Sequence, residues 1–117
     1  MVRAALVQFS GHEAKESNIR KAEDLARQAA GNGARIICFP ELATTIYFCF
    51  DRDRKSYFGS AVFIDPRGTV IGRAGDKENE ILYADIDPRV CDDTRDLWGF
   101  FKFRRPDAYG EIVGGTV

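Results

Sequence analysis

The pattern of hydrophobic and polar positions predicts a strand, a helix and a second strand in the first forty residues. Residues 2–9 are apolar in a continuous rather than an alternating pattern, which is typical of a strand covered on both faces. Residues 35–39 predict another short buried strand, which Pro40 ends. Strand, helix and strand with short links form a βαβ unit, so we expect the two strands to be parallel. The helix is predicted over residues 15–32, and its apolar face is expected to hold Ile19, Ala22, Leu25, Ala26 and Ala29.

The second half of the chain has the pattern of antiparallel structure. Strands are predicted over residues 58–65 and 69–74, on either side of Asp65-Pro66-Arg67-Gly68, which suits a β-turn. A further strand over residues 81–86 and a helix over 88–97 follow. We expect an α/β (α+β) fold in which all five strands form one mixed sheet with both helices on one face. Its other face would then expose apolar side chains.

Composition and charge exclude several classes of protein. The 117 residues are 44% hydrophobic and 30% charged with a net charge of -1, which fits one soluble globular domain. This charge gives no attraction to nucleic acid or to an anionic membrane surface. No apolar run approaches the roughly 20 residues that cross a bilayer, and the first residues do not have the pattern of a signal peptide.

The cysteines point to a reducing compartment. There are three, Cys38, Cys49 and Cys91, in no disulfide-framework spacing, so we expect a cytoplasmic protein. With no CxxC pair and a single histidine, His12, the sequence predicts neither a metal site nor a cofactor. Cys38 lies within the second predicted strand, where we expect it to belong to the core.

The segment Phe39-Pro40-Glu41-Leu42 carries the chemistry that the sequence suggests. It places a carboxylate directly after a buried strand, where a general base could sit. Taken by itself, the segment favours a simpler role for Glu41, as a helix N-cap or as a loop carboxylate in an ion pair.

Several segments, in order, resemble the nitrilase (carbon-nitrogen hydrolase) superfamily, and in particular the branch of N-carbamoylputrescine amidase and β-ureidopropionase. The resemblance covers nearly the whole chain. Residues 2–9, the first helix and 33–42 resemble the start of the family domain, 57–68 its late hairpin, and 82–87, 94–101 and 104–110 its C-terminal end.

The resemblance implies an αββα sandwich that hydrolyses non-peptide C–N bonds of N-carbamoyl amines or amides through a Cys-Glu-Lys triad. Glu41 matches the general base. The lysine and the nucleophilic cysteine lie in a long central portion of the family domain, which this chain lacks, and family members are usually more than twice as long. The resemblance therefore implies a single, internally truncated domain over residues 1–117, with residues 1–50 as its N-terminal part and 56–117 as its C-terminal part.

Cys49 has two possible placements in the family pattern. It matches a non-catalytic cysteine that some members carry shortly after the glutamate. It also matches the nucleophile, because residues 49–53 resemble the Cys-Tyr-Asp-Arg segment of the family. In neither placement does a lysine of the chain match the triad lysine, since Lys55 lies in a charge run without that motif.

Two functions therefore stay open at this stage. The chain is a hydrolase of a small-molecule amide or N-carbamoyl substrate, or it is a catalytically inactive remnant or interaction module that lacks the triad lysine and the cysteine. In the second case the aromatic and basic tail, residues 98–110, would pair with a second copy or with a full-length relative. The missing centre would be either a true deletion or a coding segment dropped from the gene.

Overall fold

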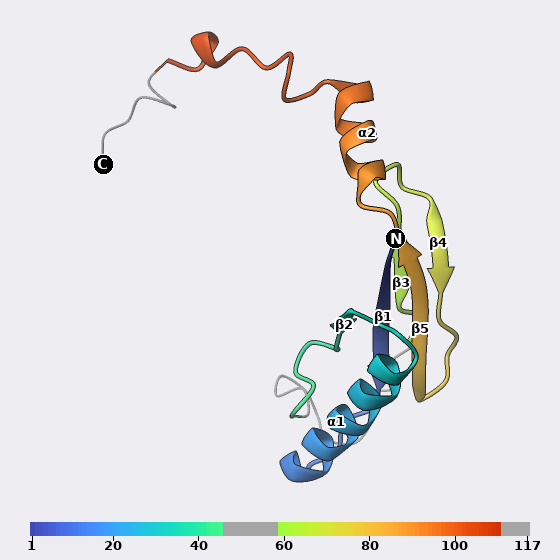
Figure 1. Ribbon diagram of the computed structural model, residues 1–117. Helices are drawn as coiled ribbons and strands as arrows, with labels where there is room; N and C mark the ends of the chain where they lie inside the picture. The colour runs from blue at the N-terminus through green and yellow to red at the C-terminus, as the bar shows by residue number, and fades with distance from the viewer. Residues whose placement is uncertain (46–58, 111–117) are drawn as a thin grey trace. The chain divides into compact units, whose positions relative to one another are not determined.

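The computed structural model describes residues 1–45 and 59–110 (Figure 1). The chain divides into two compact units, Met1–Asp87 and Pro88–Val117. Among the described residues, no helix combines the length and the apolar character that a bilayer crossing requires.

The first unit is built around the strand β1, Val2–Phe9. On one side β1 pairs in parallel with β2, Ile36–Cys38, and on the other side it pairs antiparallel with β5, Asn79–Ile86. The helix α1, Lys15–Gly31, connects β1 to β2. The predicted βαβ unit and the mixed character of the sheet are therefore confirmed, and the central place of β1 explains its continuous apolar pattern.

One face of this three-stranded sheet lies against α1. Side chains alternate across a strand, so Ala5, Val7 and Phe9 share a face, and all three are buried. The ammonium of Lys21 on α1 lies 5.6 Å from the centre of the Phe9 ring, which identifies this face as the one that the helix covers. The helix face itself differs from the prediction, because Ile19 is 36% exposed whereas Asn18 is fully buried.

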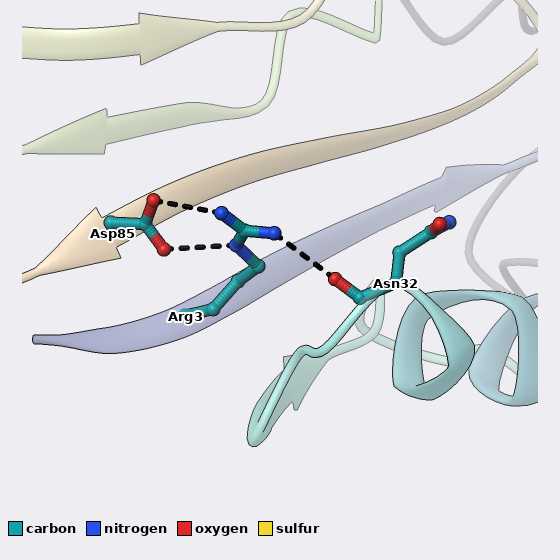
Figure 2. A network of polar contacts seen from close by, with 3 residues as sticks. All are labelled: Arg3, Asn32 and Asp85. Carbon is teal, nitrogen blue, oxygen red and sulfur yellow. Dashed lines mark hydrogen bonds and ion pairs between the residues drawn. The ribbon is translucent and has the colours of Figure 1, made fainter.

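A polar network fixes the far end of the same face (Figure 2). Arg3 donates from Nε and Nη2 to the two carboxylate oxygens of Asp85, at 2.9 and 3.0 Å, and from Nη1 to the backbone oxygen of Asn32. The hydrogen bond from Arg3 lowers the pKa of the Asp85 carboxyl. This network joins β1, β5 and the residue after α1 at the edge where β1 begins.

The hairpin consists of β3, Val62–Ile64, and β4, Val70–Arg73, paired antiparallel. Its predicted turn is confirmed: Gly68 donates its N–H to the backbone oxygen of Asp65 at 3.0 Å and has a φ of +88°. The Asp65 carboxylate accepts the N–H groups of Thr69 and Arg67, and the bond from Thr69 is the main reason that its pKa is lowered.

We expected the hairpin to join the sheet of β1, and this expectation is wrong. The hairpin forms a separate two-stranded sheet. It contacts the face of the first sheet that α1 leaves free. Gln8 and Glu80, which are paired across β1 and β5, both bond to the backbone at Gly75, and a Cβ on Gly72 would lie 3.6 Å from the Leu82 side chain. Gly72 thus lies within packing distance of Leu82, and the hairpin stacks on this face instead of extending the sheet.

The hairpin leaves the β2 end of that face uncovered. Ile36 and Cys38 pair with Ala4 and Leu6, so they lie on the hairpin face, yet Ile36 is 50% exposed and Cys38 is also exposed. The expectation that Cys38 belongs to the core is therefore wrong. The hairpin contacts β5 and reaches β1 through Gln8, whereas β2 is the opposite edge of the sheet.

The second unit begins with the helix α2, Arg89–Trp98, close to the predicted bounds. Gly99 ends it with a φ of +63° and donates its N–H to the backbone oxygen of Arg95. A short 3₁₀ turn, η1, follows at Pro106–Ala108. The rings of Trp98 and Phe100 meet edge to face at 5.5 Å, and the aromatic side chains within residues 98–109 are 47–74% exposed.

Candidate functional site

The candidate site lies where the two parallel strands end. Because β1 and β2 run in the same direction, the loops that leave them emerge at one edge of the sheet. The first loop connects Phe9 to α1, and the second follows Cys38 and carries Glu41. Carboxyl ends of parallel strands are the usual place for functional side chains in α/β proteins.

Glu41 opens a tight turn and is exposed to solvent. Leu42 has a φ of +56°, and Thr45 donates its N–H to the Leu42 backbone oxygen at 3.0 Å. Within residues 1–45 and 59–110, no group forms a hydrogen bond or ion pair with the Glu41 carboxylate. As far as the described residues are concerned, its oxygens are therefore open to a substrate or to a proton donor.

Asn18 joins the two loops. Its Oδ1 accepts the His12 N–H at 2.7 Å, and its Nδ2 donates to the backbone oxygens of His12, at 2.7 Å, and of Thr44, at 3.2 Å. The sequence analysis missed this residue. The signal was available, because Asn18 precedes Ala22, Leu25 and Ala29 at the four- and three-residue steps of one helix face.

A second carboxylate near this edge has a different environment. The Ser10 hydroxyl donates to Glu78, and Lys21 donates to the Ser10 backbone oxygen at 3.1 Å. The hydroxyl, and after it the charge of Lys21, lower the pKa of Glu78. Glu78 is thus held ionised and already accepts a hydrogen bond, which makes it a poorer proton acceptor than an open carboxylate.

The structure describes two of the three cysteines, Cys38 and Cys91. Cys49 and Lys55 lie outside the described residues. Cys38 lies on β2 and Cys91 lies on α2, in the second unit. In the part of the chain that the structure describes, no group of three His, Cys, Asp or Glu side chains could hold a metal ion.

Comparison with known families identifies the domain to which this edge belongs. Two stretches, residues 3–56 and 50–96, match the sequence model of the carbon-nitrogen hydrolase family, and they overlap over residues 50–56. The chain belongs to the carbon-nitrogen hydrolase family. These matches confirm the resemblance that the ordered segments suggested. Glu41 falls within the first matched stretch.

Individual relatives agree with this assignment. The chain is 29% identical over 110 residues to N-carbamoylputrescine amidase of Oryza sativa, which covers 88% of this chain and 36% of the rice protein. It is 42% identical over 64 residues to citrullinase of Francisella tularensis, covering 55% of this chain and 22% of that protein. It is 38% identical over 55 residues to an omega-amidase of Saccharomyces cerevisiae, covering 47% of this chain and 19% of the yeast protein.

The chain thus spans about a third or less of the length of these curated relatives. No solved structure matches it.

Proposed function

We propose that this carbon-nitrogen hydrolase family member hydrolyses an N-carbamoyl amine or a small amide, with Glu41 as general base. The observation that carries the proposal is the open Glu41 carboxylate, held in a tight turn at the carboxyl edge of the β1–β2 pair. The names of the relatives support the substrate class, since they include an N-carbamoylputrescine amidase, a citrullinase and an omega-amidase.

The proposed chemistry follows from what a thiol nucleophile needs. Glu41 accepts the proton of a cysteine thiol, which is mostly protonated at neutral pH, and the thiolate attacks the carbonyl carbon. The C–N bond then breaks, and the amine or ammonia leaves with the proton. Water hydrolyses the intermediate, which is a thioester from an amide and a thiocarbamate from an N-carbamoyl amine. Hydrolysis of the thiocarbamate gives carbamic acid, which decomposes to ammonia and carbon dioxide. Cys49 is the candidate nucleophile, and its placement in the family pattern stays open.

The triad lysine has no counterpart among the motifs of this chain. Loss of one oxyanion-stabilising group typically lowers the rate by about 10²–10³-fold. We therefore expect slow turnover. We also propose that residues 1–50 and 56–117 are two pieces of one family domain, which the two overlapping matches support. Two free cysteines in the described residues, Cys38 and Cys91, fit the proposed cytoplasmic location.

The test is ammonia release by the purified chain from N-carbamoylputrescine, N-carbamoyl-β-alanine and simple amides. Activity should fall at least about 10²-fold in Glu41→Gln, because a general base contributes this much. Cys49→Ser should abolish it, and Cys38→Ser, the matched control on the exposed end of β2, should retain it. No release by the wild-type chain, or equal release by Glu41→Gln, would contradict the proposal.

A second candidate function is a catalytically inactive interaction module. The observation that favours it is exposed apolar surface: Ile36 on β2, and Phe100, Phe101 and Phe103 in the tail, which are 71–74% exposed. Such surface marks interaction sites when it is contiguous. In this reading the tail, residues 98–110, binds a second copy or a full-length relative.

Light scattering after size-exclusion chromatography tests this second function. A dimer, or a complex with a full-length relative, that is lost in the double variant Phe100→Ser and Phe101→Ser would support it. A monomer that binds no relative and little hydrophobic dye would count against it. Genomic sequencing across codons 48–58 would show separately whether a central coding segment is missing from the gene.

A further inference from the structure

Asn18 is the largest side chain that is fully buried among the described residues. A buried amide costs free energy unless its polar atoms are hydrogen-bonded. Both N–H donors and one lone pair of Asn18 are used, all three on backbone groups of loops. The hydrogen bonds of Asn18 therefore satisfy its own polar atoms and also hold the backbone of two loops.

The first loop is held at two points. Asn18 accepts the N–H of His12 and donates to its carbonyl oxygen, both at 2.7 Å. A peptide backbone bound at both groups of one residue cannot rotate freely about that residue. The loop between β1 and α1 is thus fixed to the first turns of the helix that follows it.

The second loop is held through Thr44, three residues after Glu41. The two loops also pack closely, since a Cβ on Gly11 would lie 3.5 Å from the Thr45 backbone oxygen and 3.7 Å from Asn18 Nδ2. These are van der Waals distances, so the backbone at Gly11 lies against the Thr45 backbone and the Asn18 side chain. The hydrogen bonds of Asn18 therefore hold the Glu41 loop against the loop after β1.

Leu42 gives an independent sign that the Glu41 turn is constrained. A left-handed conformation costs a non-glycine residue about 1–2 kcal/mol, and it persists where the surroundings hold the backbone in place. Leu42 has a φ of +56° and directly follows Glu41. The bond from Thr45 to the Leu42 oxygen and the bond from Asn18 to the Thr44 oxygen fall on this one turn.

We propose that Asn18 is the positioning residue of the Glu41 general base: it fixes the turn of residues 41–45 to the loop after β1. The catalytic part of this inference rests on the proposed function. A base must lie within hydrogen-bond reach of the proton that it takes, and a displacement of about 1 Å can lower the rate by about 10²-fold. The turn needs an anchor because Glu41 itself has no partner among the described residues.

Amide hydrogen exchange on the full chain tests the positioning role without requiring turnover. Asn18→Asp keeps the size of the side chain, but it replaces both donors with a carboxylate oxygen that faces two carbonyl oxygens. The Thr45 amide should then exchange at least about tenfold faster. The Arg35 amide, which bonds to the Arg3 oxygen between β1 and β2, should change less than about twofold.

Asn32→Asp is the matched control. Asn32 follows the same helix, is exposed, and donates from its side chain to the Tyr83 hydroxyl, away from the Glu41 loop. It should leave the Thr45 amide unchanged. Equal acceleration of the Thr45 and Arg35 amides in Asn18→Asp would show a general loss of stability and overturn the proposal, as would an unchanged Thr45 amide.

Hydrolysis measurements separate the two proposals. If the wild-type chain releases ammonia, Asn18→Asp should lower kcat about tenfold or more and leave KM within about twofold, because the base and not the bound substrate is displaced. If the wild-type chain shows no turnover but Asn18→Asp still speeds exchange of the Thr45 amide alone, the anchoring of the turn is upheld and the proposed hydrolase is contradicted. Turnover that Asn18→Asp leaves unchanged would contradict the positioning role and uphold the hydrolase.

Discussion

β1 and β2 are both short apolar strands in the same sheet, yet only β1 is buried. β1 lies between two partners, with α1 on one face and the hairpin on the other, and Ala4, Ala5, Val7 and Phe9 are at most 9% exposed. β2 is an edge strand: Ile37 is half-buried on the helix face, whereas Ile36 and Cys38 are exposed on the face that the hairpin does not reach. An apolar strand pattern thus predicts a strand but not what covers it.

The two strands also differ in how firmly they are held, and the candidate site follows the less firmly held strand. β1 is anchored at both ends, by Arg3 at its start and by Gln8 near its end. β2 spans three residues and leads directly into the exposed Glu41 turn. The proposed role of Asn18 connects the two, because its hydrogen bonds to His12 and Thr44 join the loop after β1 to the turn that carries Glu41.

The largest effect should come from the buried strand. Val7→Ala should lower the free energy of unfolding by about 2 kcal/mol, because it removes two buried methyl groups and leaves a cavity. Ile36→Ala removes more atoms but should cost less than about 1 kcal/mol, because Ile36 is 50% exposed. Urea denaturation of both variants measures this. A larger cost for Ile36→Ala would break the contrast between the strands.

The next effect concerns the hairpin layer. Gln8 donates to the backbone oxygens of Lys77, at 2.8 Å, and Gly75, at 3.3 Å, and accepts the Ala61 N–H at 3.2 Å. Gln8→Ala should therefore cost about 1–2 kcal/mol and speed exchange of the Ala61 amide. Gln28→Ala, on the exposed side of α1, is the control and should change neither quantity. Equal effects of the two variants would mean that Gln8 does not hold the hairpin.

The smallest effect is a pH dependence at the start of β1. The Arg3 hydrogen bond lowers the folded-state pKa of Asp85 below the unfolded value of about 3.9. Its contribution is therefore full above about pH 4–5 and is lost as the pH falls through the lower folded-state value. Asp85→Asn should melt slightly below the wild type at pH 6, and the difference should shrink by pH 3. A constant difference would show that the charge of Asp85 contributes nothing.

Local signals made much of the first unit predictable. The apolar run of β1, the helix period of α1, and the Pro66 and Gly68 positions of the turn each act within a few residues, and the structure has these elements close to the predicted bounds. The parallel pairing of β1 and β2 followed from the length of the connection between them. The family assignment also came from ordered local segments, and the family matches confirm it.

What the sequence did not predict depends on contacts between distant segments. A hairpin that extends a sheet and a hairpin that stacks on one have the same alternation of apolar and polar residues. In this structure the hairpin is stacked, with Gly72 packed beside Leu82 and the Ala61 N–H bonded to the Gln8 side chain. Asn18 looks like an ordinary polar helix residue until His12 and Thr44 are brought beside it. Glu41 was placed correctly at a strand end, and the role of Cys49 stays a prediction because it lies outside the described residues.

The most direct test of the central claim is a measurement of ammonia release from N-carbamoylputrescine. It compares the wild type with Glu41→Gln and Glu78→Gln. Both substitutions remove one exposed carboxylate near the same sheet edge, but among the described residues Glu78 accepts a hydrogen bond from Ser10, whereas Glu41 accepts none. We predict slow release by the wild type, a loss of about 10²-fold or more in Glu41→Gln, and near wild-type release in Glu78→Gln. Equal rates for the wild type and Glu41→Gln, or no release by any of the three, would contradict the claim that Glu41 is the general base of a hydrolase.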